Sequence, residues 1–286
     1  MSARLLEGKP IAVKIKDEIR KEVSEVTSKL SKKPTIAGVQ IGDNPAADVY
    51  FKSQIKCASE LDIEYQHHKL SAEIPQNELF AFIDSLNNNT RVNALFVQMP
   101  LPAHIDSRLL YRHISPLKDA EGMHPENLGK LFFGKARVIP CTPRSIMELL
   151  KATGINLYGK EAVIVGHSEI VGKPLSLLLL EQFATTTVCH IATGERGLTA
   201  EHLKHAEVVV VAVGRANLIK GEWIKEGAIV VDVGINRVND KLVGDVEFEE
   251  AAKRAAWITP VPGGVGPLTV AMLMRNVVEA AKLQLC

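Results

Sequence analysis

The chain has 286 residues, of which 46% are hydrophobic and 23% charged, as in globular proteins with one large or two medium domains. Because 34 basic residues nearly balance 33 acidic ones, no excess charge points to nucleic acid or another polyanion. The longest apolar runs, such as 208–213, are too short to cross a bilayer. We therefore expect no nucleic-acid partner and no membrane partner.

The cysteines are scattered and lack the CxxC or Cys/His spacing of a zinc site. They are Cys57, Cys141, Cys189 and Cys286. Charged residues such as Lys9 and Lys14 interrupt the N-terminal region, so it has no apolar run typical of a signal peptide. We expect reduced thiols, no metal centre and a cytoplasmic location.

The first half of the chain alternates between helical and strand patterns. Hydrophobic residues recur at helical spacing over 11–30, and Pro34 ends that predicted helix. The elements expected next are a strand over 35–41, a helix over 44–61, a strand over 65–70, a helix over 76–86 and a strand over 94–97. This alternation predicts βαβ units and a parallel sheet.

Between residues 114 and 142 prolines and glycines interrupt the pattern, and we take this loop-rich stretch as the domain boundary. A helix is expected to begin near Thr142, where threonine precedes a proline. A second βαβ series follows. Its expected strands are 162–165, 186–189, 207–213, 229–233 and 257–258, and its expected helices are 170–180 and a C-terminal helix reaching about 283.

The segment Asp43–Lys56 predicts a helix that begins after Pro45. At 3.6 residues per turn, Tyr50 and Gln54 share one stripe of this helix, and Lys52 and Lys56 lie on roughly the opposite side. Taken alone, the segment is most simply interpreted as an amphipathic helix with a solvated lysine edge. The alternative is a wall of an active site.

Residues 163–174 read as strand, glycine turn and helix, the context in which backbone N–H groups at a helix N-terminus bind a phosphate. The spacing Gly166-x5-Gly172 is not GxGxxG, so a tight turn without a ligand remains an alternative. No acid occupies positions 188–193, where an NAD-binding protein normally carries one. His167, His190, Thr193 and Arg196 are polar groups near the expected 2′-phosphate. The pattern favours NADP and does not exclude NAD.

A second candidate ligand loop, 260–267, contains three prolines and three glycines in eight residues. Prolines stiffen such a loop, and glycines admit a ligand close to the backbone.

Taken together, the motifs resemble the bifunctional methylenetetrahydrofolate dehydrogenase/methenyltetrahydrofolate cyclohydrolase family of the bacterial FolD type. The resemblance covers essentially the whole chain. The motifs occur in the family's order and are Gly42-Asp-Asn-Pro-Ala-x-x-Val-Tyr50, Val97-Gln-Met-Pro-Leu-Pro102, Lys118-Asp-Ala-Glu-Gly-Met-His-Pro125, Pro140-Cys-Thr-Pro143, Gly166-x-Ser-x-Ile-Val-Gly-Lys-Pro174 and Pro260-Val-Pro-Gly-Gly-Val-Gly-Pro267.

The resemblance implies an α/β fold with two domains flanking a cleft. The N-terminal catalytic domain would comprise residues 1–140 and a C-terminal helix of about 267–286, and a Rossmann-type NAD(P)-binding domain would comprise 141–266. It also implies a homodimer formed through the Rossmann domains. The expected reaction is oxidation of 5,10-methylenetetrahydrofolate to the methenyl form by NADP, followed by hydrolysis to 10-formyltetrahydrofolate.

By resemblance, the site residues fall into three groups. The catalytic positions are Tyr50, Gln54, Gln98 and Glu121. Substrate contacts are expected from Tyr50, Val97, Gln98, Pro100, Glu121, Pro262 and Gly263. Cofactor contacts are expected from Gly166, His167, Ser168, Ile191, Arg196 and Ile235.

Several of these positions depart from the family's pattern. Gln54 stands where the family has its catalytic lysine, Glu121 where it has aspartate, and Ala47 where it usually has serine. In the cofactor site, His167 and Ile191 replace the usual arginine and serine.

These departures bear differently on the two reactions. Hydride removal needs alignment but no proton acceptor, whereas hydrolysis of the methenyl cation releases a proton and needs a base. An amide has no useful basicity near pH 7. We therefore expect dehydrogenase activity to be kept and cyclohydrolase activity to be weak or absent, although Glu121 is a possible compensating group.

Two other readings of the sequence stay open. One is a catalytically impaired folate- or nucleotide-binding paralogue with a regulatory role. The other is a Rossmann dehydrogenase for a different small substrate, which would leave Tyr50, Gln98 and Pro262 unexplained.

Overall fold

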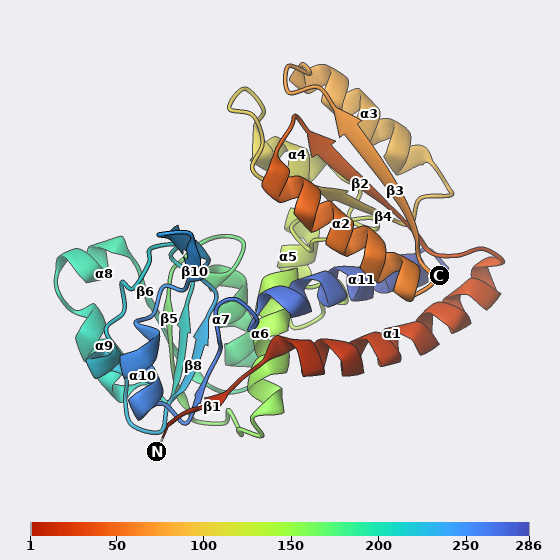
Figure 1. The fold of residues 1–286 in the computed structure, drawn as a ribbon. Helices are drawn as coiled ribbons and strands as arrows, with labels where there is room; N and C mark the ends of the chain where they lie inside the picture. The colour runs from red at the N-terminus through yellow and green to blue at the C-terminus, as the bar shows by residue number, and fades with distance from the viewer. Residues whose placement is uncertain (1, 286) are drawn as a thin grey trace. The chain divides into compact units, whose positions relative to one another are not determined.

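The structure, a computed structural model, describes residues 2–285 (Figure 1). It divides into two compact units. One comprises the chain up to Val13 together with Thr142–Thr269, and the other comprises Lys14–Cys141 together with the chain from Val270 onward. Three helices contribute residues to both units; they are α1 (Gly8–Leu30), α6 (Cys141–Ala152) and α11 (Gly266–Leu283).

The unit that contains Lys14–Cys141 is built on a three-stranded parallel sheet of order β3-β2-β4. Its strands are β2 (Thr35–Ile41), β3 (Glu64–Leu70) and β4 (Ala94–Val97). Its further helices are α2 (Pro45–Glu60), α3 (Gln76–Asn88), α4 (Ser107–His113) and α5 (Pro125–Phe132). Side chains alternate across β2: Ala37 and Val39 pack with the α3 residue Ile83, whereas Gly38 faces Phe51 of α2. Helices α2 and α3 therefore cover opposite faces.

Helix α5 was not predicted, because it lies inside the stretch interpreted as loop. The His124 side chain accepts a hydrogen bond from the backbone N–H of Glu126, and Pro125 occupies the first turn. Proline is compatible with that position because its missing N–H would have no partner inside the helix. The proline that suggested a loop is thus the first residue of a short helix.

The other unit contains a six-stranded sheet of order β1-β11-β8-β7-β5-β6, in which every neighbouring pair is parallel. The strands are β1 (Arg4–Leu5), β5 (Glu161–Val165), β6 (Thr185–Cys189), β7 (Val208–Val211), β8 (Ile229–Asp232) and β11 (Trp257–Ile258). The helices are α7 (Gly172–Glu181), α8 (Ile191–Glu195), α9 (Thr199–His205), α10 (Phe248–Arg254) and the 3-10 helix η1 (Gly221–Trp223). The predicted parallel sheet and α/β class are confirmed.

Several short elements of this unit escaped prediction. Strand β1 has two residues, and α8, α9 and α10 have five to seven, too few for a helical period to become visible. A hairpin of β9 (Asn236–Val238) and β10 (Lys241–Val243) was also missed. Its turn residues Asn239 and Asp240 both have positive φ, as a tight hairpin turn of this kind requires.

The order of the six strands creates a switch point. Strand β5 pairs with β6 on one side and with β7 on the other, so the chain crosses over β5 after β6. In open parallel sheets ligands bind outside the carboxyl ends of the strands at such a point. A ligand site is therefore expected at the carboxyl ends of β5, β6 and β7.

Other sequence expectations concern thiols, metals and membranes. Cys57 and Cys189 are buried, and Cys286 lies outside the described residues. Over residues 2–285 we find no group of three or more His, Cys, Asp or Glu side chains that could hold a metal ion. Nor does this range contain a helix long and apolar enough to span a membrane.

Candidate active site

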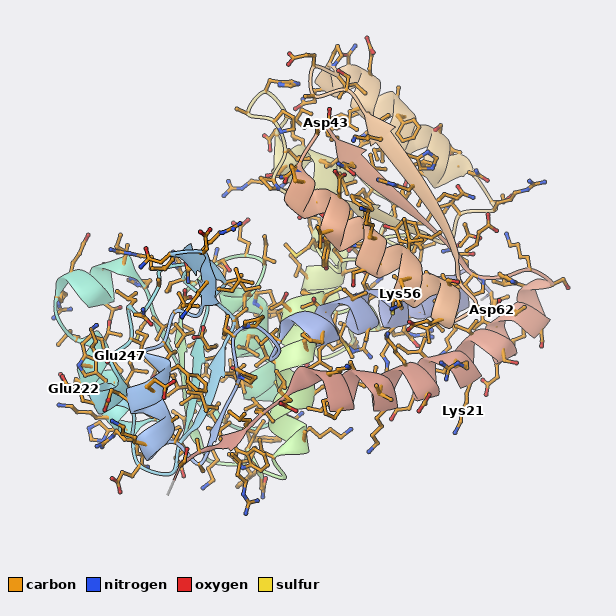
Figure 2. The ribbon with its side chains drawn as sticks, in the orientation of Figure 1. Lys21, Asp43, Lys56, Asp62, Glu222 and Glu247 are labelled. Atoms are coloured by element: carbon orange, nitrogen blue, oxygen red, sulfur yellow. The ribbon has the colours of Figure 1, made fainter. Side chains whose placement is uncertain are left out.

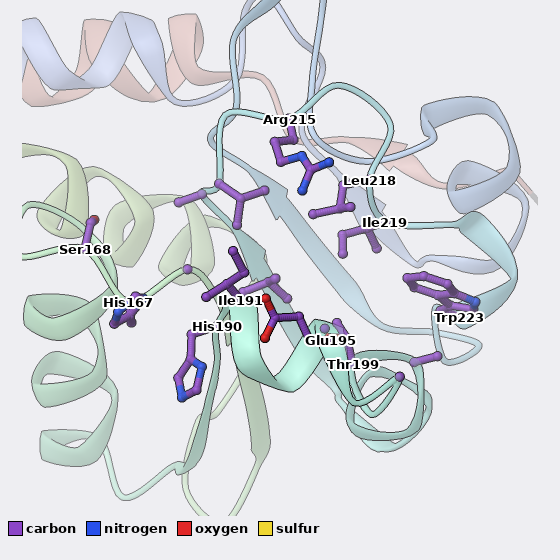
Figure 3. Close-up of a pocket in the computed structure, with 17 residues that line it drawn as sticks. His167, Ser168, His190, Ile191, Glu195, Thr199, Arg215, Leu218, Ile219 and Trp223 are labelled. Atoms are coloured by element: carbon purple, nitrogen blue, oxygen red, sulfur yellow. The ribbon is translucent and has the colours of Figure 1, made fainter.

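A pocket of about 690 Å³ opens at the switch point (Figure 3). Its walls come from the turn after β5, the residues after β6 and the segment after β7. Figure 3 shows His167 and His190 at one end of the pocket and Trp223 at the other. Most of the lining is apolar, with a few polar groups, as in sites for organic cofactors.

Two glycines shape the turn after β5. Gly166 has φ +122°, and a Cβ there would come to 2.4 Å from the carbonyl oxygen of Ala212. At the first residue of α7, a Cβ on Gly172 would come to 2.0 Å from the carbonyl oxygen of Gly166. The Gly166-x5-Gly172 spacing therefore lets the helix start directly against the turn, with its N-terminal N–H groups near the pocket.

The pocket brings together most of the cofactor residues expected from the sequence. Gly166, His167, Ser168 and Ile191 all line it. The rings of His167 and His190 lie 5.3 Å apart. By contrast, Arg196 and Ile235 are exposed and are not among the lining residues, so the structure does not bring these two into the pocket.

Sequence reasoning missed the wall formed after β7. Arg215, Leu218, Ile219 and Trp223 line that side of the pocket. The available signal was the continuous apolar strand that ends before Gly214, because the carboxyl end of a central parallel strand is where a ligand wall is expected.

Two buried carboxylates hold this wall. Asp245 accepts hydrogen bonds from the backbone N–H groups of Val213, Gly214 and Arg215 at 2.7, 2.9 and 2.8 Å. Asp232 in turn accepts from the N–H of Asp245, at 3.0 Å, and from two further backbone groups. Burial raises the pKa of Asp232 to about 6, and its backbone hydrogen bonds oppose that rise. The acids act as anchors of the loop.

The second group of candidate residues lies on α2, in the other unit. This helix turns Ala47, Phe51 and Gln54 toward the sheet, and all three are buried. Tyr50 is partly buried, and its ring centroid lies 6.2 Å from that of Phe96 on β4. Lys56 is exposed, as is Lys52; Figure 2 labels Lys56 along α2, between Asp43 and Asp62. The predicted separation of the lysines from the Tyr50 side is confirmed.

Gln54 is more deeply buried than its place on one side of a surface helix would suggest. It has no exposed surface, and its Oε1 accepts a hydrogen bond of 2.5 Å from the Tyr65 hydroxyl on β3. Its Nε2 is buried and has no partner among the described residues. Tyr65 had not been singled out in the sequence, because nothing in its neighbourhood resembles a motif.

Gln98 follows the carboxyl end of β4, directly after the buried Val97. Its backbone N–H donates to the carbonyl of Val39, and its Nε2 donates to the carbonyl of Met99. Its Oε1 is buried without a hydrogen-bond partner in the described range. Pro100, the neighbouring predicted contact, is exposed. Gln98 thus offers its Oε1 to a ligand as a hydrogen-bond acceptor.

Glu121 lies on a loop organised by Asp119. Asp119 accepts hydrogen bonds from the backbone N–H groups of Glu121, Gly122 and His124, and from the side chain of Asn127. Burial and the nearby charge of Asp119 raise the pKa of the Glu121 carboxyl to about 8. At pH 7 this side chain is therefore largely protonated, unlike an ordinary glutamate.

Pro262 and Gly263 belong to the unit with the six-stranded sheet. Gly263 has φ +118°, and its carbonyl accepts a hydrogen bond of 2.9 Å from the N–H of Gly8, the first residue of α1. A Cβ on Gly8 would meet the carbonyl oxygen of Gly264 at 1.9 Å. The loop is therefore packed tightly against the start of α1.

Comparison with known proteins covers nearly the whole chain. Residues 6–121 match the catalytic domain of tetrahydrofolate dehydrogenase/cyclohydrolase, and residues 140–285 match its NAD(P)-binding domain. The chain is 48% identical to the bifunctional protein FolD of Acetivibrio thermocellus over 285 residues, with 99% of each chain covered. It is also 48% identical to the bifunctional protein FolD of Halothermothrix orenii over 281 residues, with 98% of each covered.

Similar solved structures belong to the same family as the sequence relatives. The bifunctional FolD methylenetetrahydrofolate dehydrogenase/cyclohydrolase of Campylobacter jejuni is 44% identical, with a TM-score of 0.93, and the match covers 99% of this chain and 100% of that one. The Trypanosoma brucei enzyme, solved with NADP and an inhibitor, is 36% identical, with a TM-score of 0.94 and 99% of each chain covered. The chain belongs to the tetrahydrofolate dehydrogenase/cyclohydrolase family of FolD type.

Proposed function

We propose that the protein oxidises 5,10-methylenetetrahydrofolate to 5,10-methenyltetrahydrofolate with NADP, and that its cyclohydrolase activity is weak. In this proposal the unit containing Lys14–Cys141 binds the folate, and the unit containing Thr142–Thr269 binds the dinucleotide. The supporting observation is the pair of preserved sites, one around Tyr50 and Gln98 and one at the Gly166 turn. A folate-binding paralogue without catalysis would not need both.

The residues at the switch point fit a dinucleotide. The turn between Gly166 and Gly172 leaves no room for a Cβ and presents the N-terminus of α7, which suits a pyrophosphate. Residues 188–193 contain no acid that would select the ribose diol of NAD. The paired imidazoles of His167 and His190 are compatible with a 2′-phosphate. When bound, NADP accepts the hydride.

On the folate side the protein supplies alignment. Tyr50 offers an aromatic face to a flat pterin. Gln98 offers a buried acceptor whose desolvation would be compensated by a donor on the substrate. Removing a hydride leaves a cation and transfers no proton to the protein, so these groups suffice for the first reaction.

Hydrolysis of the methenyl cation is the step that this site supports poorly. The Gln54 amide cannot take up the proton that water releases. Its oxygen is already the acceptor for Tyr65. Glu121 has a pKa of about 8, so only a small fraction of it is ionised at pH 7. At that pH the Gln54 amide is not a base, and Glu121 is mostly in its protonated form.

We further propose a homodimer formed through the edge strand β6. This strand ends the six-stranded sheet, and its free edge can pair with another chain. Close to it in sequence, Leu180 and Phe183 are 53% and 71% exposed, and Phe183 contacts the equally exposed Tyr158. Exposed aromatic and aliphatic side chains beside the free edge of β6 are typical of an interface between two copies of a chain. The buried thiols Cys57 and Cys189 are consistent with a cytoplasmic location.

The test is a two-activity assay with purified protein. We expect reduction of NADP at 340 nm with methylenetetrahydrofolate, slower or no reduction of NAD, and slow disappearance of added methenyltetrahydrofolate. A Gln54→Lys variant should gain hydrolysis, whereas the exposed-lysine controls Lys52→Gln and Lys56→Gln should leave both activities unchanged. Absence of reduction with either cofactor would refute the dehydrogenase, and rapid hydrolysis by the unmodified protein would refute the weak cyclohydrolase.

A further inference from the structure

We propose that Tyr65 is a positioning residue of the folate site: its hydroxyl fixes the orientation of the Gln54 amide so that the amide nitrogen is presented as a hydrogen-bond donor to the substrate. The same contact makes this site a poor host for a basic lysine at position 54. This inference rests on the proposed function and adds a residue that no motif of the sequence includes.

The first support is the space made for the Tyr65 hydroxyl. A Cβ on Gly38 of β2 would come to 2.1 Å from this hydroxyl oxygen and 2.8 Å from the ring of Phe51. A side chain at residue 38 would therefore displace the phenol from its place above the strand. With glycine there, the Tyr65 ring lies across the sheet, packs edge-on against Phe51 and reaches Gln54.

The second support is the state of the amide. Because Oε1 of Gln54 accepts the Tyr65 proton, Nε2 is directed away from the hydroxyl. Nε2 is buried and has no hydrogen-bond partner in the described chain. A buried donor without a partner is unfavourable, and a ligand acceptor would remove that cost. Because Gln54 has no exposed surface, this role requires the side chains that cover it to move when the substrate binds.

The third support is proximity to the substrate wall. Tyr50 lies one helical turn before Gln54 on α2. The Tyr50 ring packs with Phe96, Phe96 packs with Phe51, and Phe51 packs with Tyr65, so both tyrosines border one aromatic cluster. A ring stacked on Tyr50 would therefore have its carbonyl oxygen or a ring nitrogen available to the Gln54 donor.

The consequence for a lysine follows from the same geometry. A lysine ammonium at residue 54 would find the Tyr65 oxygen as an acceptor, and a hydrogen bond to the charged form stabilises that form. The amine would then be largely protonated at neutral pH, so only a small fraction of the molecules could accept a proton from water, and hydrolysis by Gln54→Lys alone would rise only modestly. Replacing the tyrosine by phenylalanine removes the acceptor, and burial then lowers the lysine pKa toward the range of a useful base.

The first experiment measures dehydrogenase kinetics of Tyr65→Phe, Gln54→Leu and the double variant. We expect Tyr65→Phe to raise the KM for methylenetetrahydrofolate by about tenfold, to change kcat by less than about twofold, and to leave the KM for NADP unchanged. In the Gln54→Leu background the tyrosine change should have no further effect on this KM.

The matched control is Ile36→Val. Ile36 is fully buried and is the cross-strand partner of Tyr65, so its truncation loosens the same part of the sheet without touching the amide. We expect this control to lower the Tm while leaving the folate KM unchanged. Equal KM values for Tyr65→Phe and the unmodified protein would overturn the proposal, as would additive effects in the double variant.

The second experiment compares methenyltetrahydrofolate hydrolysis by Gln54→Lys and by Gln54→Lys/Tyr65→Phe across pH. We expect the double variant to be faster at pH 7 and to reach half of its maximal rate at a lower pH. A pH profile that the tyrosine change does not move would overturn the proposal. Failure of the proposed function is distinguishable, because it would appear as no NADP reduction by the unmodified protein in the dehydrogenase assay.

A third measurement observes the amide directly in the unmodified protein. In unmodified protein labelled with ¹⁵N-glutamine, the Gln54 side-chain amide resonance is assigned as the one lost in Gln54→Leu. Addition of tetrahydrofolate should shift this resonance strongly, whereas the resonance of the exposed Gln182 should stay in place. An unshifted Gln54 amide at saturating tetrahydrofolate would contradict a donor role.

Discussion

The carbonyl oxygen of Gly166 and the α-carbon of Gly172 are so close that a methyl group on Gly172 would come within 2.0 Å of that oxygen. The obstacle is backbone and cannot swing aside. Gly172→Ala should therefore push α7 away from the turn after β5, destabilise the protein by about 2–4 kcal/mol and weaken NADP binding by tenfold or more. Thermal unfolding and the KM for NADP measure the two effects.

The control for this substitution is Gly129→Ala. Gly129 lies within α5, and a Cβ there would meet nothing within 4 Å. Alanine is the better helix former by about 1 kcal/mol, so stability should rise slightly and the KM for NADP should not change. Normal NADP binding by Gly172→Ala would show that the close contact does not shape the cofactor site.

Glu121 should make folate binding dependent on pH. Because its carboxyl has a pKa of about 8 and amino groups of a pterin prefer a carboxylate, substrate binding should release a proton. The KM for methylenetetrahydrofolate is therefore expected to fall as pH rises from 6 to 8, and Glu121→Gln should flatten this profile. A KM that stays constant over this range in the unmodified protein would exclude the role.

The Glu121 carboxyl should also make the free energy of unfolding depend on pH: as pH rises, folate binding is expected to strengthen, whereas the protein is expected to become less stable. Its pKa is raised from 4.5 in the unfolded chain to about 8 in the folded one, so between these values only the folded state holds the proton. Its contribution to the free energy of unfolding is full below pH 4.5 and is lost as pH rises toward 8. Urea unfolding at pH 5 and pH 8 should show a smaller decrease for Glu121→Gln than for the unmodified protein.

Asp245 should be essential for the loop after β7. It is fully buried and accepts the N–H groups of Val213, Gly214 and Arg215, whereas an asparagine would direct its own N–H groups at some of these donors. We expect Asp245→Asn to cost about 2–5 kcal/mol of stability and to raise the KM for NADP. The exposed Asp240→Asn, which loses an ion pair with Arg237, should change neither quantity measurably.

Phe183 should control oligomeric state. If β6 forms the homodimer, Phe183→Glu places a charge in the interface and should give a monomer in light scattering after size exclusion. Phe133→Glu is the matched control, because Phe133 is 73% exposed, also pairs with a neighbouring aromatic ring and lies in the other unit. Dissociation by both variants, or by neither, would argue against the β6 edge.

Much of the fold was available from sequence because its signals are local. The apolar run over β2 and the alternation of strands with long helices predict a buried parallel sheet, and the structure has one in each unit. Pro45 marked the start of α2, and the helical period separated Tyr50 from Lys52 and Lys56. The glycines at residues 166 and 172 marked a turn that the structure contains.

What only the tertiary structure decided depends on residues distant in sequence. Tyr65 reaches Gln54 because Gly38, on the neighbouring strand, leaves room for its hydroxyl, and no local pattern carries that information. The raised pKa of Glu121 comes from burial, which a motif cannot convey. Local periodicity determined which elements form, whereas the environment of each polar group was set by packing between strands and helices that the chain brings together only on folding.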